Sequence, residues 1–156
     1  MDEFMMTRNR ILAAFGLAAA MLFAGPAQAE LERVTDLQAL KDNGERKPTV
    51  VMFTAENCPY CELAKEAHLG PMSRDEAHSD VNILMVEMNG EEVRDFDGNT
   101  MRGSELGNRY GARVTPTLVA FDAGGNPVGR PLVGIPNEEL YRSQVRMRIN
   151  AAREGS

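Results

Sequence analysis

The apolar positions of this chain fall into short continuous runs that predict buried strands. The run TVVMFT at 49–54 is apolar and β-branched, which is typical of a strand covered on both faces of a sheet. A second run, VNILMVEM at 81–88, has the same character. Further on, TLVAFDAGGNPVGRPLVGI at 117–135 predicts two strands joined by a Gly-Gly-Asn-Pro turn, which is a hairpin signal.

Helical signals lie between these runs. Residues 35–43 open with Thr-Asp-Leu-Gln, which fits a capping box and predicts a short helix. The segment ELAKEAHL at 62–69 predicts a second helix, which Gly70 and Pro71 are expected to stop. A third, short helix is expected at 104–110.

A last helix begins after the predicted hairpin. Asn137 suits its N-cap, and Glu138 and Glu139 place two acids in the first turn. Its buried face is expected to consist of four residues at helical spacing: Tyr141, Val145, Ile149 and Ala152. The element order α-β-α-β-α-β-β-α predicts a single α/β domain with a central mixed β-sheet flanked by helices.

The segment 89–103 is polar and rich in Gly and Asp, and it predicts a long connection of the kind that often carries function. Its Asp-Phe-Asp-Gly-Asn sequence at 95–99 is similar to the opening of a calcium loop. The twelfth position of such a loop is Leu106, however, and Glu105 falls one residue short. Without that bidentate ligand, the sequence argues against calcium binding.

The first 29 residues stand apart from this pattern. Two arginines, at 8 and 10, precede an apolar run at 11–24, and the segment closes on Ala-Gln-Ala at 27–29. This arrangement predicts a secretory signal peptide, cleaved after Ala29, and places the folded domain at 30–156. An uncleaved membrane anchor is the alternative, but a spanning helix needs roughly 20 apolar residues. We therefore expect export and a periplasmic location.

The charge balance and the number of cysteines argue against several classes of function. The expected mature chain has 15 basic and 21 acidic residues, a balance that argues against nucleic-acid binding and against an anionic membrane surface as partner. Disulfides persist in exported proteins. The chain has only two cysteines, however, whereas small secreted folds held by disulfides usually have four to eight.

The two cysteines, Cys58 and Cys61, form a C-P-Y-C motif with three possible uses. A structural zinc ion needs four ligands, and the only further candidates are His68 and His78, so we expect no metal. A disulfide across so short a loop changes the entropy of the unfolded chain only slightly. The third use is redox chemistry.

The position of the motif favours redox chemistry. Cys58 falls where a strand ends and a helix begins, so Cys58 suits the N-cap and Pro59 the first helical position. The backbone N–H groups of Tyr60 and Cys61 can then point at the Cys58 sulfur, and the helix N-terminus stabilises a thiolate. Such sites lower a cysteine pKa from about 8.5 to roughly 3.5–7.5. Cys61, one turn into the helix, is shielded but close enough to attack a mixed disulfide.

Two segments resemble the thioredoxin superfamily. VVMFTAENCPYCELAK is similar to its strand-CxxC-helix signature, and ARVTPTLVAFDAGGNPVGRPLVG resembles its later hairpin with a cis-proline. The resemblance covers about 34–149. With the segment DFDG and the exported N-terminus, the chain looks most like a periplasmic branch that includes SoxW-type proteins of sulfur-oxidation clusters and relatives of the DsbC catalytic domain.

The resemblance implies a role for each site residue. Cys58 resembles the attacking cysteine and Cys61 the resolving one. Pro116 matches the cis-proline that faces the pair, and Thr115 precedes it. In the family this proline exposes the backbone of the preceding residue to an extended substrate. Pro59, Tyr60, Thr115 and Pro116 are therefore expected to contact substrate.

The chain also departs from the thioredoxin pattern. Thioredoxins have a buried acid six residues before the first cysteine, and here that position is Met52. They also have a Trp shortly before the motif, and this chain contains no Trp. The Pro-Tyr dipeptide resembles glutaredoxins. The fold is therefore better supported than the specific activity of thioredoxin.

The leading hypothesis is a thiol:disulfide oxidoreductase that needs no cofactor. Its expected partners are protein thiols and disulfides in the periplasm and a membrane protein that donates or accepts electrons, and we expect a monomer. The resemblance favours a reductase, because the SoxW-type branch acts in that direction. An oxidase or isomerase is the alternative, and a redox-inert binding module is a third.

Overall fold

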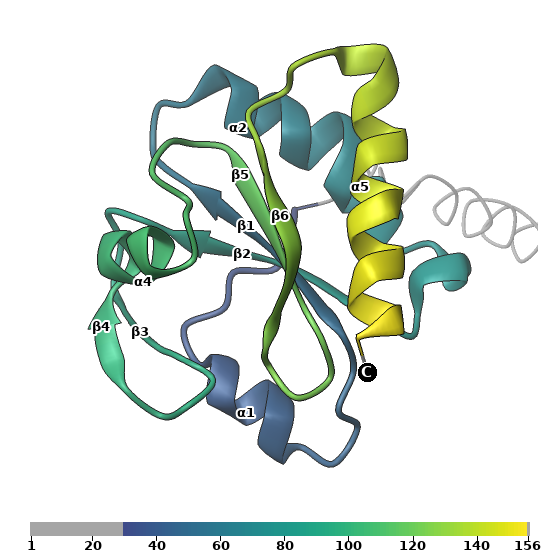
Figure 1. Ribbon diagram of the computed structural model, residues 1–156. Helices are drawn as coiled ribbons and strands as arrows, with labels where there is room; N and C mark the ends of the chain where they lie inside the picture. The colour runs from purple at the N-terminus through teal and green to yellow at the C-terminus, as the bar shows by residue number, and fades with distance from the viewer. Residues whose placement is uncertain (1–29, 156) are drawn as a thin grey trace, which may run out of the picture.

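The computed structural model describes residues 30–155 and contains a four-stranded mixed sheet in the order β2-β1-β5-β6 (Figure 1). Strand β1 (Thr49–Thr54) pairs in parallel with β2 (Asn82–Glu87). On its other side β1 pairs antiparallel with β5 (Thr117–Phe121), which pairs antiparallel with β6 (Pro127–Val133). The predicted α/β domain with a central mixed sheet is confirmed.

The sheet separates two hydrophobic clusters. Every residue of β1 is buried, as its continuous apolar run predicts. Because side chains alternate along a strand, Met52 joins the cluster on one face and Phe53 the cluster on the other. The first face packs against α5 (Glu138–Glu154), and the second packs against α1 (Leu37–Asp42) and α4 (Gly103–Arg109).

The two terminal helices begin close to where the sequence places them. The side chain of Asn137 caps α5 by accepting a hydrogen bond from the Leu140 N–H at 3.0 Å, and the predicted apolar face is buried. The prediction for α1 is wrong by one residue. Its N-cap is Asp36 rather than Thr35, because the Asp36 carboxylate accepts a hydrogen bond from the Ala39 N–H at 3.0 Å.

The helix that follows the cysteines does not stop at Gly70-Pro71, so that prediction is wrong. Helix α2 (Pro59–Leu63) continues through a π-helical turn (Ala64–Leu69) into α3 (Gly70–Ser73). In the widened turn the Gly70 N–H donates to the Lys65 carbonyl, five residues earlier. Pro71 then falls in the first turn of α3, where a missing N–H is tolerated.

The segment 89–103 is not an irregular connection, so its prediction needs correction. It contains β3 (Glu92–Arg94) and β4 (Thr100–Arg102), which form a separate two-stranded antiparallel hairpin. The Arg94 N–H donates to the Thr35 carbonyl at 2.8 Å, so the hairpin is fastened to the chain before α1. Figure 1 shows the hairpin beside α4.

The same five-residue turn closes both hairpins, at 95–99 and 122–126. In each turn the aspartate Oδ1 accepts hydrogen bonds from the N–H groups two and four residues later. The glycine at the fourth position has a φ of 88° in the first turn and 83° in the second, which favours glycine. The carboxylate of Asp95 also pairs with Arg109. The 95–99 segment is therefore a turn whose aspartate is occupied by donors from the protein.

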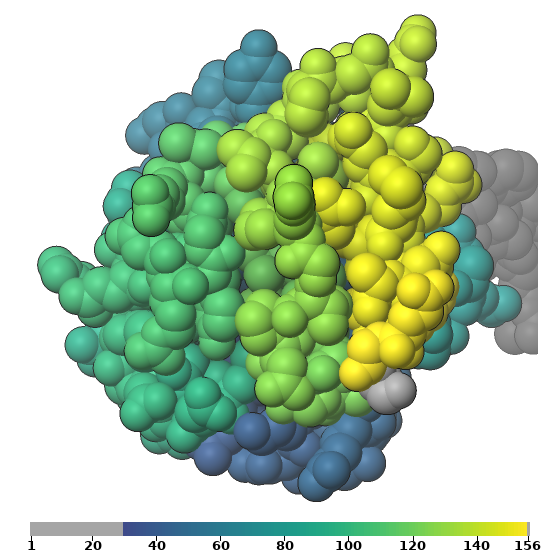
Figure 2. Space-filling model, in the orientation of Figure 1, coloured from purple at the N-terminus to yellow at the C-terminus, as the bar shows by residue number. Residues whose placement is uncertain are grey.

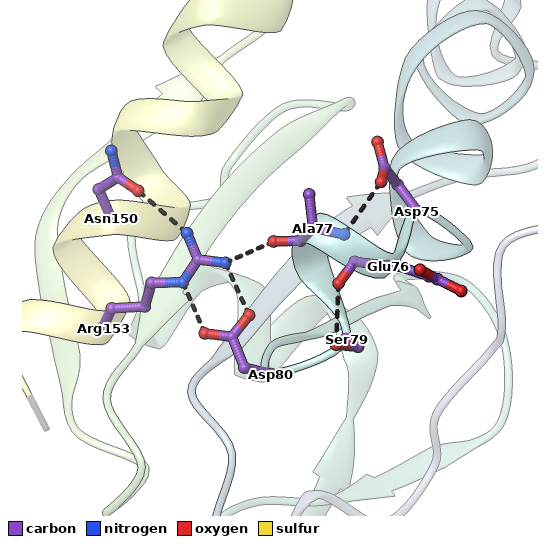
Figure 3. Close-up of polar contacts among 7 residues, drawn as sticks. All are labelled: Asp75, Glu76, Ala77, Ser79, Asp80, Asn150 and Arg153. Atoms are coloured by element: carbon purple, nitrogen blue, oxygen red, sulfur yellow. Dashed lines mark hydrogen bonds and ion pairs between the residues drawn. The ribbon is translucent and has the colours of Figure 1, made fainter.

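The far end of α5 is fastened by an ion pair (Figure 3). The Arg153 guanidinium donates to both carboxylate oxygens of Asp80, at 2.8 and 2.6 Å, and to the Ala77 carbonyl at 3.0 Å. This contact joins α5 to the turn before β2. Figure 2 shows α5 beside the β5–β6 hairpin on one face of the molecule.

Over residues 30–155, no helix has the length and apolar character to cross a bilayer. Within the same residues, no three His, Cys, Asp or Glu side chains gather as they would around a metal ion. The predicted signal peptide, with its cleavage after Ala29, lies outside the described residues and stays a prediction.

Candidate active site

Cys58 and Cys61 form a disulfide at the start of α2, with their Cα atoms 5.2 Å apart. After β1 the chain turns through Asn57, whose φ is 56°, a left-handed conformation that asparagine tolerates better than most residues. Cys58 is the N-cap and Pro59 the first helical residue, as predicted. The Cys61 N–H lies 3.3 Å from the Cys58 sulfur and donates to it.

The two sulfurs differ in accessibility. Cys58 is half-buried, whereas the side chain of Cys61 is 0% exposed. Pro59 is exposed, and Tyr60 projects into solvent with 63% of its surface accessible. A reagent in solution can therefore approach Cys58, while Cys61 is covered by the protein.

The loop that holds Thr115 and Pro116 lies against the disulfide. The Thr115 hydroxyl donates to the Cys58 sulfur across 3.6 Å. The Thr115–Pro116 peptide bond is cis. The Pro116 carbonyl accepts a hydrogen bond from the Gly134 N–H at 2.8 Å, so the end of β6 fixes the loop. The structure thus brings the predicted residues of both segments to one place.

Two exposed apolar residues belong to the same region, although the sequence analysis did not select them. Val114 precedes Thr115 and is 55% exposed, and Val133, at the end of β6, is 49% exposed. With Tyr60 they supply apolar surface on three segments near the disulfide. The signal that points to Val114 is its place next to the Thr-Pro pair, whereas Val133 has no such local signal.

The charges beside the cysteines are mostly solvated. Glu56 is exposed, and Glu62 forms an ion pair with Lys65 in which the nitrogen and oxygen are 2.7 Å apart. This pairing offsets the negative charge that Glu62 would otherwise bring near the Cys58 sulfur. Met52, at the position six residues before Cys58, is fully buried and apolar.

The chain matches the family model described as a thioredoxin-like domain over residues 35–146. No curated protein matches it. Among solved structures it is similar to thioredoxin from Fasciola hepatica, with 17% identity and a TM-score of 0.55, covering 79% of this chain and 100% of that one. It is also similar to mitochondrial thioredoxin 3 from Saccharomyces cerevisiae in its oxidised form, with 17% identity and a TM-score of 0.52, covering 75% and 94%.

A third similar structure is thioredoxin from Malassezia sympodialis. It is 20% identical with a TM-score of 0.54, and the match covers 80% of this chain and 95% of that one. At such low identity these likenesses establish the fold alone. A disulfide-bonded cysteine pair at a helix start on this fold supports thiol:disulfide oxidoreductase chemistry in general. With a family model that matches most of its length, the chain belongs to the thioredoxin-like domain family.

Proposed function

We propose that this protein is an exported thiol:disulfide oxidoreductase that reduces disulfides of other proteins in the periplasm. The observation that carries the proposal is the environment of the Cys58 sulfur. It accepts hydrogen bonds from the Cys61 N–H and the Thr115 hydroxyl and lies at a helix N-terminus. All three features favour a thiolate over a thiol once the disulfide is reduced.

The reaction begins with the reduced pair. The Cys58 thiolate attacks one sulfur of a substrate disulfide, and the electron pair of the broken bond leaves on the other substrate sulfur. Cys61, as thiolate, then attacks the Cys58 sulfur and releases the second substrate sulfur. The Cys58–Cys61 disulfide forms, and the substrate has gained two electrons and two protons. The substrate would contact the residues around Cys58, which are Pro59, Tyr60, Thr115 and Pro116.

Regeneration of the dithiol requires two electrons from another protein. The periplasm is kept oxidising, so we propose a membrane protein as donor. The reducing direction rests on the resemblance to the SoxW-type periplasmic branch, and export rests on the Arg-rich start, apolar run and Ala-Gln-Ala ending of residues 1–29.

Reduction of insulin disulfides in the presence of dithiothreitol tests the activity. We expect catalysis by the parent chain and none by Cys58→Ala. Equilibration with reduced and oxidised glutathione then measures the reduction potential of the pair. A reductase should lie near the thioredoxin value of about −270 mV, whereas a value near −120 mV would indicate an oxidase. Absence of insulin reduction would favour a redox-inert module.

A further inference from the structure

The resolving step needs a base for Cys61. That side chain is fully buried, and a buried thiol in apolar surroundings keeps its proton more tightly than one in water. The helix N-terminus and Thr115 act on Cys58 rather than on Cys61. Directly before the motif, the strand offers the apolar Met52. Met52 cannot accept the proton of Cys61, so the strand position before the motif provides no base.

The register of β1 and β2 identifies the sheet face beneath α2. Met52 pairs with Met85, and both belong to the same core cluster as Ala64. Ala64 lies one turn after Cys61 in the same run of helix. The side chains of Met52 and Met85 thus face the helix that carries the cysteines.

The next pair on that face is Thr54 and Glu87. The two are partners in the β1–β2 register, two residues beyond Met52 and Met85. Because alternate side chains of a strand share a face, Thr54 and Glu87 also point toward the side of α2. They end their strands, and α2 begins only four residues after Thr54. Glu87 therefore lies on the cysteine side of the sheet, at the end where the disulfide sits.

Glu87 is a buried acid with one free oxygen. Its residue is 9% exposed, and its Oε2 lies 4.0 Å from the guanidinium of Arg33, which is half-exposed. Over residues 30–155, neither Glu87 Oε1 nor the buried Thr54 hydroxyl has a hydrogen-bond partner in the protein. Buried polar groups are nearly always bonded to protein or to ordered water. Because Glu87 and Thr54 are paired neighbours, one water molecule could bond to both the Glu87 Oε1 atom and the Thr54 hydroxyl.

Two glycines let the β3–β4 segment close over Glu87. A Cβ atom at Gly90 would lie 2.8 Å from Glu87 Cγ, and one at Gly103 would lie 2.2 Å from the Glu87 carbonyl oxygen. Both distances are shorter than real contacts, so only glycine permits this approach. Gly90 precedes β3 and Gly103 follows β4. The hairpin is thus held close to Glu87 at both of its ends.

We propose that Glu87 accepts the proton of Cys61 in the resolving step, through a water molecule that also bonds to Thr54. The inference rests on the proposed function. The Cys61 thiol passes its proton to that water as the water gives one to the Glu87 carboxylate. The Cys61 thiolate attacks the Cys58 sulfur, and the bond from Cys58 to the substrate breaks with its electron pair on the substrate sulfur. The proton on Glu87 returns through water to the released thiolate. Glu87 and Thr54 are positioning residues.

Dithiobis(nitrobenzoate) separates the two steps in the reduced protein. Attack by Cys58 releases one coloured thionitrobenzoate, and attack by Cys61 on the mixed disulfide releases the second. In Glu87→Gln we expect the second release to slow on the order of 100-fold near neutral pH, the low end of the usual effect of a general base. The pH at which the second release reaches half of its maximal rate should rise in Glu87→Gln. The rate of the first release should stay unchanged.

Three further variants complete the test. Thr54→Val should slow the second release in the same way but less, and Glu87→Asp should restore part of it. Glu105→Gln, which changes an exposed carboxylate in α4, should leave both releases unchanged. An unchanged rate and pH midpoint of the second release in Glu87→Gln overturns the proposal. A faster second release also overturns it, because the carboxylate would then act only as a charge opposing the thiolate.

The folded state is checked by the first release, which depends on Cys58 alone. Slowing of both releases by the same factor would indicate a general structural role and overturn the proposal. If Glu87→Gln does not fold, Thr54→Val decides, and an unchanged second release in that variant overturns the proposal. A parent chain that gives no second release would refute the proposed function itself, so the two failures are distinguishable.

Discussion

The hydroxyl of Thr115 lies 3.6 Å from the sulfur of Cys58, although the two residues are 57 positions apart. Local sequence rules place Cys58 at a helix start but cannot bring Thr115 to it. Here the contact depends on the order of strands, since β5, which follows Thr115, lies next to β1, which precedes Cys58. The environment of the Cys58 sulfur is therefore determined by two segments, the start of α2 and the loop before β5. A substitution can change either segment separately.

Thr115→Val removes a hydrogen-bond donor from the Cys58 sulfur while keeping the shape of the side chain. A hydrogen bond to a charged group contributes about 1.5–3 kcal/mol. Since one pKa unit corresponds to about 1.36 kcal/mol, we expect the pKa of Cys58 to rise by about one to two units. Ultraviolet absorbance of the thiolate against pH in the reduced protein measures it. Thr100→Val, at an exposed threonine of β4, is the control, and an equal pKa in parent and Thr115→Val contradicts the prediction.

Cys61→Ala should trap substrates covalently. Cys58 remains accessible and can attack a disulfide, but no neighbouring thiol releases the mixed disulfide. We expect adducts that survive non-reducing electrophoresis and disappear on reduction. Cys58→Ala is the matched control and should give none, because Cys61 is covered by the protein. More adducts with Cys58→Ala than with Cys61→Ala would mean that the roles of the two cysteines are reversed.

The sequence predicts best those helices and strands whose apolar residues follow a regular local pattern. The apolar run of β1 and the spaced apolar face of α5 both survive in the structure because burial follows directly from them. The β3–β4 hairpin was missed because its strands have three residues each and only Val93 is buried. The hairpin is joined to distant residues by the hydrogen bond from the Arg94 N–H to the Thr35 carbonyl and by the ion pair of Asp95 with Arg109.

The candidate site also contains residues that a local sequence signal predicts and residues that it does not. The N-cap role of Cys58 follows from the Pro that comes next, and the structure agrees. Glu87 carries no such signal, since an acid at the end of an apolar run is usually exposed. It is buried here because the chain returns over it at Gly90 and Gly103, which only the tertiary structure reveals.

Arg153→Ala should destabilise the protein modestly by releasing the end of α5 from Asp80. Both partners are partly exposed, but the pair is bidentate, so we expect a loss of about 0.5–1 kcal/mol in the free energy of unfolding. Urea denaturation measures this, and Arg146→Ala, at an exposed arginine of the same helix, is the control. The hydrogen bond from Arg153 lowers the pKa of Asp80, so the contribution is present above about pH 4 and is lost as pH falls further. Equal stability of Arg153→Ala and Arg146→Ala would show that the ion pair contributes nothing.

His68 should make the protein less stable in mild acid. Its ring is buried and packs edge-on against Tyr141 of α5, with 5.0 Å between ring centroids. Over residues 30–155, neither ring nitrogen has a hydrogen-bond partner in the protein. Burial is the main cause that lowers the pKa of His68; the positive charge of Arg142 adds to it, and Glu138 opposes it. The folded state therefore resists protonation that the unfolded chain accepts near pH 6.5.

The sign of the pH dependence follows from that difference. Above about pH 7 His68 is neutral in both states and adds no pH dependence. As pH falls through about 6.5, the unfolded state binds the proton first, so the free energy of unfolding decreases. His68→Phe keeps an aromatic ring against Tyr141 but cannot titrate, so its urea midpoint should change less between about pH 7.5 and pH 5.5 than that of the parent. If His68→Phe loses stability in acid as steeply as the parent, then His68 is not the group responsible.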